Sequence, residues 1–382
     1  MDEKTFIRKV KLSVVVPCYN EERTLRDCIK NILKIRDDKL SIEIIIVDDG
    51  SKDNSAFIAQ ELMEDYPEVI LISQKVNQGK GAALRIGFQR ASGDFIAVQD
   101  ADLEYDPNDL KKLLVPLINN EADVVLGSRF LSSGYHRVLY FWHYIGNKLL
   151  TLISNMFTDL NLTDMETCYK VFRRDVIQNI RIQENRFGIE PEIVAKIADM
   201  RLRIFEMGIS YYGRTYEEGK KIGFKDGIRS LYCIFHYNAY RAPIPIQFFI
   251  YIFVGSTAAI VNLLIFLALF KNGIQTEFAA PVAFIIAAIA NYYLGIAFLF
   301  RHKIKWNSFI EILTYSIVVT IVAFVDLTAT KYFILADILP EYSKLGATGI
   351  SFIFNFLGRR FIVFPEKPRG EWKPKFLKNK HL

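Results

Sequence analysis

Paired acidic residues stand out in this sequence because they lie where a metal ion or a nucleotide could be bound. Asp100 and Asp102 are separated by one residue and follow a short apolar run, residues 95–99. Two carboxylates this close are costly unless a cation neutralises them, and such hard oxygen ligands suit Mg²⁺ or Mn²⁺ shared with a phosphate. A lone Asp-x-Asp is weak evidence, because acidic turns are common. Here two further polar clusters also follow apolar runs, at residues 17–22 and 48–51.

A lysine between two glycines adds a candidate phosphate ligand. Lys80 is flanked by Gly79 and Gly81, and the missing side chains would let the backbone approach an anion closely. The segment is not a Walker A loop, because position 81 is Gly where that motif has Ser or Thr. None of the expected strand-to-helix turns contains G-x-G-x-x-G, so a Rossmann dehydrogenase is disfavoured.

Polar residues further downstream are suited to a second anion or to the hydroxyl groups of a sugar. Arg129 follows another apolar run, and Asp164 and Glu166 form a second carboxylate pair. His143 and Asn147 share a helix face at the i, i+4 spacing. A basic loop at 213–221 holds Arg214 and Lys220; taken alone, it is best interpreted as a solvated turn.

The elements that position these residues alternate between strand and helix. Apolar, β-branched runs predict strands at residues 11–16, 41–47, 69–73, 95–99 and 123–127. Helical patterns are expected between them, at residues 22–35, 55–66, 81–91 and from 107 onward. This alternation predicts a mainly parallel sheet with helices on both faces. Ligands bind at the carboxyl ends of strands in such sheets, which is where the polar clusters fall.

The 382 residues divide into two unlike halves near residues 243–245. The chain is 51% hydrophobic with 24% charged residues, which excludes disordered, collagen-like and disulfide-scaffold proteins. Charges are spread evenly before the divide, whereas residues 246–270 and 278–300 contain no Asp, Glu, Lys or Arg. Together with residues 312–336 and 342–358, these runs predict four membrane-spanning helices.

Basic residues flank the expected spans unequally. They gather in residues 301–305 and in the tail after residue 358, whereas the alternate loops hold few. The positive-inside rule therefore predicts a multi-pass protein of the plasma membrane with residues 1–245 and the C-terminal tail in the cytoplasm. No signal peptide is expected, because the chain begins without an apolar core. The net charge of +6 then reflects topology and anionic lipid headgroups, not a nucleic-acid partner.

The membrane half contains a weak internal repeat. Val261-Asn262-Leu263 is similar to Val325-Asp326-Leu327, 64 residues later. Leu294-Gly295 is similar to Leu357-Gly358, 63 residues later, and aromatic residues follow both. These offsets predict a duplicated two-helix hairpin.

Taken in order, the segments of the first half resemble family 2 glycosyltransferases of the GT-A fold, in the branch that glycosylates polyprenyl or dolichyl phosphate. The matching segments are VVVPCYNEE (14–22), VDDGS (47–51), NQGKGAALRIGF (77–88), QDADLEYDP (99–107), GSRF (127–130), DMETCYKVF (164–172) and YYGRTYEEGKKIG (211–223). The second half resembles a GtrA-like membrane domain, chiefly through the Asn, Gly and aromatic residues that end the second and fourth spans.

The resemblance implies an α/β GT-A domain, with its Rossmann-like sheet, joined to an all-α four-helix transmembrane domain. The expected boundaries are a cytoplasmic glycosyltransferase domain at 1–223, interfacial amphipathic helices at 224–245, the transmembrane domain at 246–364 and a basic cytoplasmic tail at 365–382. A homo-oligomer is left open.

The resemblance also implies a reaction. It is the inverting, metal-dependent transfer of a hexose from a UDP- or GDP-linked sugar to polyprenyl or dolichyl phosphate on the cytoplasmic membrane face. The nucleotide-sugar would be bound by Pro17, Tyr19, Glu21, Val47, Asp49, Lys80, Asp100, Ala101, Asp102, Glu104, Arg214 and Lys220. Asp100 and Asp102 would hold Mg²⁺ or Mn²⁺.

The resemblance also implies which residues bind the acceptor and which carry catalysis. The acceptor phosphate would be bound by Ser128, Arg129, His143 and Asn147. The residues that carry catalysis would be Asp100, Asp102, Arg129, Asp164 and Glu166. A phosphate monoester is mostly dianionic at pH 7, so this nucleophile needs little or no deprotonation. Asp164 and Glu166 could orient sugar hydroxyls, and a general-base role for them is left open but is not required.

Departures from the family pattern leave the sugar open. Mannose synthases have Gln two residues past the Asp-x-Asp, where this chain has Glu104, and an Arg and a Ser on the acceptor helix, where it has His143 and Asn147. A processive synthase is disfavoured, because such enzymes carry an Arg-Trp pair that this sequence lacks. A flippase or transporter of lipid-linked sugar is the alternative, supported by Asp326 inside an expected span.

Overall fold

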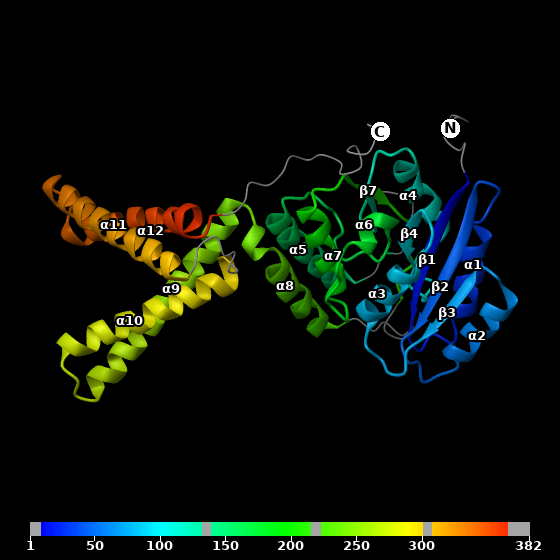
Figure 1. Ribbon diagram of the computed structural model, residues 1–382, viewed down its shortest axis with the longest axis horizontal. Helices are drawn as coiled ribbons and strands as arrows, with labels where there is room; N and C mark the ends of the chain where they lie inside the picture. Colours follow the sequence, from blue (N-terminus) through cyan, green and yellow to red (C-terminus); the bar gives the residue numbers. More distant parts are fainter. Residues whose placement is uncertain (1–8, 132–137, 139, 215–222, 301–307, 366–382) are drawn as a thin grey trace. The chain divides into compact units, whose positions relative to one another are not determined.

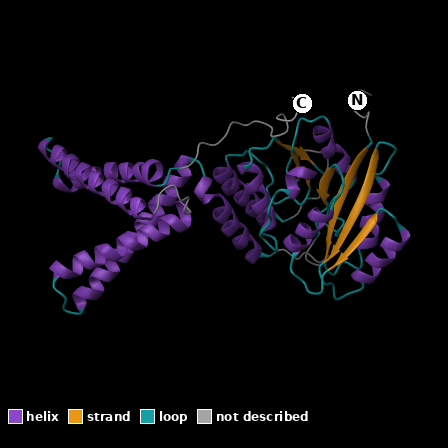
Figure 2. Ribbon diagram, in the orientation of Figure 1, coloured by secondary structure: helices purple, strands orange, loops and turns teal. Residues whose placement is uncertain are grey.

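The computed structural model describes residues 9–131, 138, 140–214, 223–300 and 308–365. The described residues form two compact units, which divide between Asn238 and Ala239 (Figure 1). The first unit combines a sheet with helices, and the second is helical (Figure 2). Each unit is described by itself.

The first unit is built on a seven-stranded sheet with the order β3-β2-β1-β4-β6-β5-β7. Its strands are β1 (Val10–Cys18), β2 (Leu40–Asp48), β3 (Val69–Ser73), β4 (Phe95–Val98), β5 (Val124–Ser128), β6 (Lys170–Arg173) and β7 (Ile204–Gly208). The pairings are parallel except that β6 runs antiparallel to both β4 and β5. The expected parallel sheet is thus confirmed for the first five strands, while the reversed strand β6 was not predicted.

Helices flank this sheet, as the alternating pattern predicted (Figure 2). They are α1 (Leu25–Lys34), α2 (Ser55–Asp65), α3 (Lys80–Arg90), α4 (Asn108–Ile118), α5 (Phe141–Thr158), α6 (Arg174–Gln178), α7 (Ile189–Asp199) and α8 (Phe224–Asn238). The central strands are fully buried: Val14, Val15, Ile44 and Ile45 have no exposed surface. Such strands read as continuous apolar runs, which is why they could be located from the sequence to within about two residues.

One carboxylate inside the first unit ties three segments together. Glu43 on β2 is buried. It accepts hydrogen bonds from Lys11 Nζ at 2.7 Å, from Ser92 N at 2.9 Å, from Ser92 Oγ at 2.6 Å and from the Ser13 hydroxyl. These contacts fix β1, β2 and the turn before β4. Burial alone would raise the pKa of Glu43, but the hydrogen bonds from Lys11, Ser13 and Ser92 outweigh it and lower the pKa to about 2.

The second unit repeats one helical hairpin. Its two long helices, α9 (Ile244–Lys271) and α11 (Ser308–Leu335), begin 64 residues apart. The shorter helices, α10 (Thr276–Gly295) and α12 (Pro340–Gly358), also begin 64 residues apart. Each shorter helix continues into a π-helical turn, η3 (Ile296–Phe300) and η4 (Arg359–Val363). The structure therefore contains the duplicated hairpin that the weak sequence repeat predicted.

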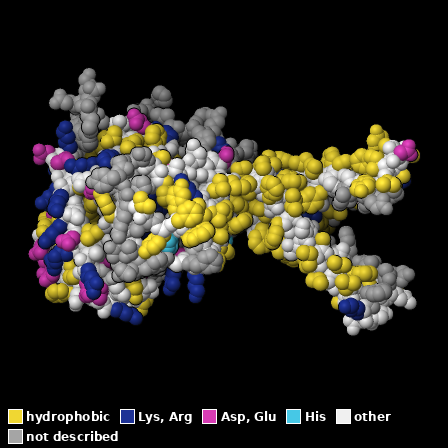
Figure 3. Space-filling model, turned by 180° about the vertical axis from the view of Figure 1, so that it is seen from behind, with side chains coloured by type: hydrophobic (Ala, Val, Ile, Leu, Met, Phe, Trp, Pro, Cys, Tyr) yellow, Lys and Arg dark blue, Asp and Glu magenta, His cyan; other side chains and the backbone are white. Residues whose placement is uncertain are grey.

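The long helices of this unit are suited to a lipid environment. Both α9 and α11 are long and apolar enough to cross a membrane, and the most apolar windows of α9 and α11 are only 11% and 6% buried within the protein. A core helix of a soluble protein would be mostly buried. Figure 3 accordingly shows a mainly hydrophobic face on the second unit, whereas charged side chains are scattered over the visible face of the first.

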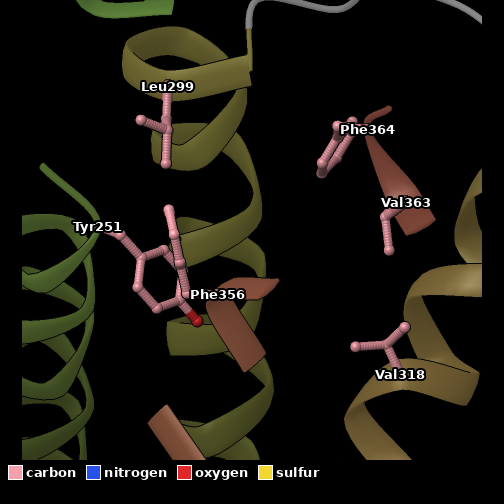
Figure 4. Packing of buried hydrophobic residues seen from close by; sticks show 6 residues of the cluster. All are labelled: Tyr251, Leu299, Val318, Phe356, Val363 and Phe364. Atoms are coloured by element: carbon pink, nitrogen blue, oxygen red, sulfur yellow. The ribbon is translucent and has the colours of Figure 1, made fainter. Parts of the chain in front are cut away.

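Side chains from both hairpins meet in a small buried cluster. Figure 4 shows its members, which come from α9, α11, α12, both π-helical turns and the residue that follows η4: Tyr251, Leu299, Val318, Phe356, Val363 and Phe364. The two π-helical turns contribute equivalent residues, because Leu299 and Val363 are 64 positions apart.

A buried arginine also joins the hairpins. Arg359 is 4% exposed and donates hydrogen bonds to Asn355 Oδ1 at 3.1 Å, to Asn291 Oδ1 at 3.3 Å and to the Tyr315 hydroxyl at 2.8 Å. Its guanidinium also lies over the rings of Tyr251 and Tyr315. Among the described residues its partners are neutral, so the charge is held by dipoles and aromatic faces.

We expect Glu43→Gln to destabilise the first unit at neutral pH by about 1–3 kcal/mol, because the amide cannot accept all of these hydrogen bonds. The folded pKa lies below the ordinary value of 4.5, so the carboxylate stabilises the fold above pH 4.5. That contribution is lost as the pH falls towards 2. Thermal unfolding of the detergent-solubilised chain should therefore show a melting-temperature gap between parent and variant that closes between those pH values. Glu64→Gln, at an exposed position of α2, is the control, and a gap that stays constant in acid would contradict the assignment.

Candidate active site

The Asp-x-Asp segment follows β4 and forms the centre of a crowded acidic cluster. Arg214 brings the cluster together: its NH2 lies 2.9 Å from Asp102 Oδ2, its NH1 3.5 Å from Glu21 Oε2 and its Nε 3.6 Å from Glu104 Oε1. The backbone N–H of Arg214 also donates to Glu104 Oε1 at 2.7 Å. Carboxylates from two separate motifs therefore converge on the guanidinium of a third.

The charge in this cluster is only partly balanced. Burial, with the neighbouring charges of Asp100 and Glu104, raises the pKa of Asp102 to about 7, although Arg214 acts in the opposite direction. Among the described residues, no group of three or more His, Cys, Asp or Glu side chains is arranged to hold a metal ion by itself. Two aspartates whose charges repel each other nevertheless fit a cation that takes its remaining ligands from phosphates, which is how Mg²⁺ is usually bound. The donor set thus fits the expected metal.

Lys80 contacts the other aspartate of the Asp-x-Asp. Its Nζ lies 3.0 Å from Asp100 Oδ1 and 3.3 Å from Glu190 Oε1. Burial alone would lower the pKa of Lys80, but the charges of Asp100 and Glu190 outweigh it and raise the pKa well above its usual range. Lys80 is therefore a fixed positive charge beside the carboxylates.

Glu190 is a residue of the site that the sequence did not reveal. It lies 5% exposed in the first turn of α7, and its second oxygen binds Lys170, which has no exposed surface. Burial and the charge of Glu190 raise the pKa of Glu166 to about 7. Acidic residues in a first helical turn are ordinarily explained by the helix dipole, so the available signal pointed elsewhere.

The two glycines around Lys80 lie closely against another segment of the backbone. Gly79 has a φ of +103°, and a Cβ there would lie 2.4 Å from the Asn185 carbonyl oxygen. A Cβ on Gly81 would lie 2.3 Å from the Glu184 carbonyl oxygen, and the Ala82 N–H donates to Asn185 at 3.1 Å. The backbone that approaches this turn is therefore the chain's own segment before α7.

Asp49 is oriented toward the same turn. It is 3% exposed, and its carboxylate accepts hydrogen bonds from Gly79 N at 2.7 Å, Gln78 N at 2.8 Å and Gln74 Nε2 at 2.9 Å. It thereby fixes the loop between β3 and α3. Other nucleotide-site candidates lie near the ends of the adjacent strands: Pro17 is paired with Val47, and Ala101 is buried within the Asp-x-Asp.

Arg129 forms a second cationic centre next to the acidic cluster. Its Nε and NH2 each lie 2.7 Å from Asp164, which has no exposed surface. Burial alone would lower the pKa of Arg129, but the charge of Asp164 outweighs it. The guanidinium also lies over the ring of Tyr211, whose hydroxyl donates to Glu104 at 2.9 Å. Tyr211 therefore contacts both Arg129 and Glu104, the carboxylate two residues past the Asp-x-Asp.

The other residues expected at the acceptor side and in the basic loop lie in different places. The Ser128 hydroxyl bonds the Thr163 hydroxyl at 2.6 Å, beside Asp164. His143 and Asn147 lie half-buried on α5, and the His143 ring packs edge-on against Tyr140. Lys220 lies outside the described residues.

Comparison with known proteins matches each unit separately. Residues 13–181 match the model of glycosyl transferase family 2, and residues 250–364 match that of the GtrA/DPMS transmembrane domain. A dolichol-phosphate mannosyltransferase of Pyrococcus furiosus is 28% identical over 362 residues, covering 93% of this chain and 98% of that protein. A dolichyl-phosphate beta-glucosyltransferase of Trichomonas vaginalis is 30% identical and covers 53% of this chain and 66% of its own length.

Two further proteins are similar over a smaller part of the chain or at lower identity. A low-salt glycan biosynthesis hexosyltransferase of Haloferax volcanii is 30% identical over 57% of this chain and 51% of that protein. Among solved structures, glucosyl-3-phosphoglycerate synthase of Mycobacterium tuberculosis superposes with a TM-score of 0.48 at 20% identity, over 60% of this chain and 80% of that one.

The sheet, its acidic edge and the two matched models define a glycosyltransferase with the GT-A fold. The chain combines a glycosyl transferase family 2 domain at residues 13–181 with a GtrA/DPMS transmembrane domain at residues 250–364.

The close approach at Gly81 gives a sharp test of this architecture. We expect Gly81→Ala to reduce both stability and transfer, because a methyl group would meet the fixed Glu184 carbonyl and displace the turn that carries Lys80. Gly146→Ala on α5 meets nothing within 4 Å and should be neutral or stabilising by about 0.5–1 kcal/mol. Melting temperature and transfer rate are measured for both variants. Equal behaviour of the two would show that the turn tolerates the side chain.

Proposed function

We propose that this enzyme transfers a hexose from a nucleotide-sugar to polyprenyl or dolichyl phosphate, with inversion at the anomeric carbon. The observation that carries the proposal is that two groups of cations lie close together. Lys80 and Arg214 contact the Asp-x-Asp, and Arg129 contacts Tyr211, which in turn binds Glu104. A nucleotide diphosphate and a phosphate monoester are both anionic, so a reaction between them needs two such sites. The relatives named for dolichyl-phosphate glycosylation support the lipid acceptor.

The donor's diphosphate is proposed to bind between Lys80 and Arg214. Both cations are held by carboxylates, which keeps them in place before the donor arrives. On binding, phosphate oxygens would take over from Glu21 and Asp102 as partners of Arg214. The departing diphosphate would then be stabilised by charges that need no reorganisation at the moment of transfer.

Asp100 and Asp102 are the residues that would hold Mg²⁺ or Mn²⁺ at this site. The metal would supply positive charge to the leaving diphosphate and relieve the repulsion between the two carboxylates.

Arg129 is proposed to bind the acceptor phosphate, with Ser128, His143 and Asn147 nearby in sequence or on the adjoining helix. The acceptor is mostly dianionic at pH 7, so its oxygen can attack the anomeric carbon without a general base. Arg129 occupies both oxygens of Asp164, and Asp164 is therefore proposed to position the guanidinium. Glu166 is left as the candidate for orienting sugar hydroxyls.

The orientation in the membrane is part of the same proposal. The catalytic domain and the C-terminal tail would lie in the cytoplasm of a multi-pass plasma-membrane protein, with residues 224–245 at the interface. The basic residues at 301–305 and after residue 358 support this topology. Nucleotide-sugars are charged and water-soluble, so a donor site facing the cytoplasm would have direct access to them.

Asp102→Ala should lower the rate of metal-dependent transfer about a hundredfold or more while leaving the protein folded and membrane-bound. The assay measures transfer of labelled hexose from UDP- and GDP-sugars to undecaprenyl or dolichyl phosphate in detergent, with and without Mg²⁺ or Mn²⁺. Asp38→Ala, at an exposed turn, is the control for loss of one surface carboxylate. Near-parental product from Asp102→Ala would rule out the metal assignment.

Arg129→Lys keeps the positive charge but cannot bind Asp164 through two nitrogens and still present one to a phosphate. We expect the KM for the lipid phosphate to rise by about tenfold or more, with the KM for the nucleotide-sugar little changed. Asp164→Asn should act in the same direction, because the guanidinium loses its charged support.

Arg203→Lys is a matched control, because Arg203 also contacts a buried aspartate, Asp123, through two nitrogens, at 3.1 and 2.8 Å. It should change stability without changing the acceptor KM. If Arg129→Lys instead raised only the donor KM, the acceptor assignment would be wrong.

A further inference from the structure

Four charged side chains of alternating sign lead from the candidate active site into the interior of the first unit. They are Asp100, Lys80, Glu190 and Lys170, and each contacts the next. Lys80 Nζ lies 3.0 Å from Asp100 Oδ1 and 3.3 Å from Glu190 Oε1, and the other Glu190 oxygen binds Lys170 Nζ. The exposed fraction of these side chains falls in the same order, from 23% through 14% and 6% to 1%. The two inner members are therefore too deeply buried to contact a substrate.

The inner end of this series is fixed by the backbone. Lys170 stands at the start of β6, and its Nζ also donates to the carbonyl oxygen of Thr167 and, at 3.5 Å, to that of Met165. Taking an ammonium group out of water is costly unless the charge is paired and hydrogen-bonded. Glu190 supplies the paired charge from the first turn of α7. Its position is thus set by a cation that cannot itself reach the active site.

Pairing with Lys170 accounts for one oxygen of Glu190 but not for the other. The Oε1 atom faces Lys80, whose Nζ also lies within 3.1 Å of both oxygens of Asp100. Among the described residues, Asp100 and Glu190 are the carboxylates that form ion pairs with Lys80. Without Glu190, the ammonium group would be left to Asp100 and would compete with a metal ion for the oxygens of that aspartate.

We propose that Glu190 is a positioning residue of the active site, which holds Lys80 between two carboxylates and thereby keeps Asp100 available to a divalent cation. The inference rests on the proposed function for the roles of Lys80 and Asp100. It deepens that function by adding a residue on which transfer depends without any contact with the substrate. The competing explanation is that Glu190 only neutralises Lys170, and that explanation requires nothing of Lys80.

The arrangement also determines what happens to Lys80 when the donor binds. Its ammonium group can exchange the contact with Asp100 for a phosphate oxygen while it keeps the contact with Glu190. One partner is replaced and the other is retained, so the cation stays in place as the charges around it change.

The test compares three variants of the full chain in detergent. Glu190→Gln alone leaves a buried lysine without its counter-charge and is expected to be strongly destabilised. Glu190→Gln combined with Lys170→Met removes one negative and one positive charge, which restores the balance in the interior but leaves Lys80 without its second partner. Lys170→Met alone keeps the contact between Glu190 and Lys80.

The first measurement is Mn²⁺ binding in the presence of UDP or GDP, followed by the electron paramagnetic resonance signal of the free ion. We expect the double variant to recover most of the melting temperature lost in Glu190→Gln and yet to bind Mn²⁺ about tenfold or more weakly than the parent. Lys170→Met should bind Mn²⁺ as the parent does. If the double variant regained Mn²⁺ affinity along with stability, Glu190 would be a counter-charge alone and the proposal would be overturned. Equal weakening by Lys170→Met would overturn it as well.

Asp123→Asn is the matched control for loss of a buried carboxylate. Asp123 is 1% exposed and is paired with Arg203 at 2.8 Å, at the start of β5. Its variant should lower the melting temperature without changing the affinity for Mn²⁺. A loss of affinity as large as that of the double variant would show that Mn²⁺ binding merely follows stability, and the positioning role would be rejected.

Transfer of labelled hexose to a lipid phosphate separates this inference from the proposed reaction. We expect kcat of the double variant to fall about tenfold or more, with the KM for the lipid phosphate little changed, because the contact between Arg129 and Asp164 is untouched. Parental kcat in the double variant would overturn the proposal. Absence of transfer by the unmodified enzyme, with Mn²⁺ binding as expected in all variants, would reject the proposed reaction and leave the role of Glu190 intact. Absence of Mn²⁺ binding by the unmodified enzyme with either nucleotide would overturn both.

Discussion

The structure of the catalytic unit depends on how carboxylates are held together at one edge of its sheet. Asp100, Asp102, Glu104 and Glu21 lie within reach of two cations, Lys80 and Arg214. Like charges in a partly buried site repel strongly, as the raised pKa of Asp102 indicates. The backbone around them is correspondingly constrained: Glu104 accepts the N–H of Arg214, and Asp49 fixes the turn before Lys80. The same repulsion favours a cationic metal and the cations that bind a diphosphate.

The acidic edge is also connected to the helix that precedes the membrane domain. Glu184 accepts hydrogen bonds from Arg229 and Tyr237 on α8, and its carbonyl oxygen lies against Gly81. The turn that positions Lys80 is thus packed on a segment that α8 holds from the other side. Since packed interiors transmit small displacements, a change in the position of α8 would be transmitted to the turn that carries Lys80.

Much of this architecture could be predicted from the sequence, and the features that could not be predicted have identifiable physical causes. The strands that precede the acidic clusters could be predicted, because buried parallel strands are apolar throughout. The reversed strand β6 was not, since Lys170 at its start is a charged residue with no exposed surface, and its partner Glu190 comes from a helix 20 positions later. The glycines beside Lys80 were identified as a close approach, but a sequence does not say which backbone approaches. Asp164 was predicted as a site residue, whereas its two-nitrogen contact with Arg129 depends on the fold.

Arg359 in the second unit and Arg214 in the first are held by opposite kinds of partner. Arg359 in the membrane domain is bound by amide and hydroxyl groups and by aromatic faces, all of which are neutral. Arg214 in the catalytic unit is bound by carboxylates, which an incoming phosphate can replace with little change in net charge. A cation held by neutral groups is a permanent joint between helices. A cation held by anions is ready for exchange, and so it is found where the substrate is proposed to bind.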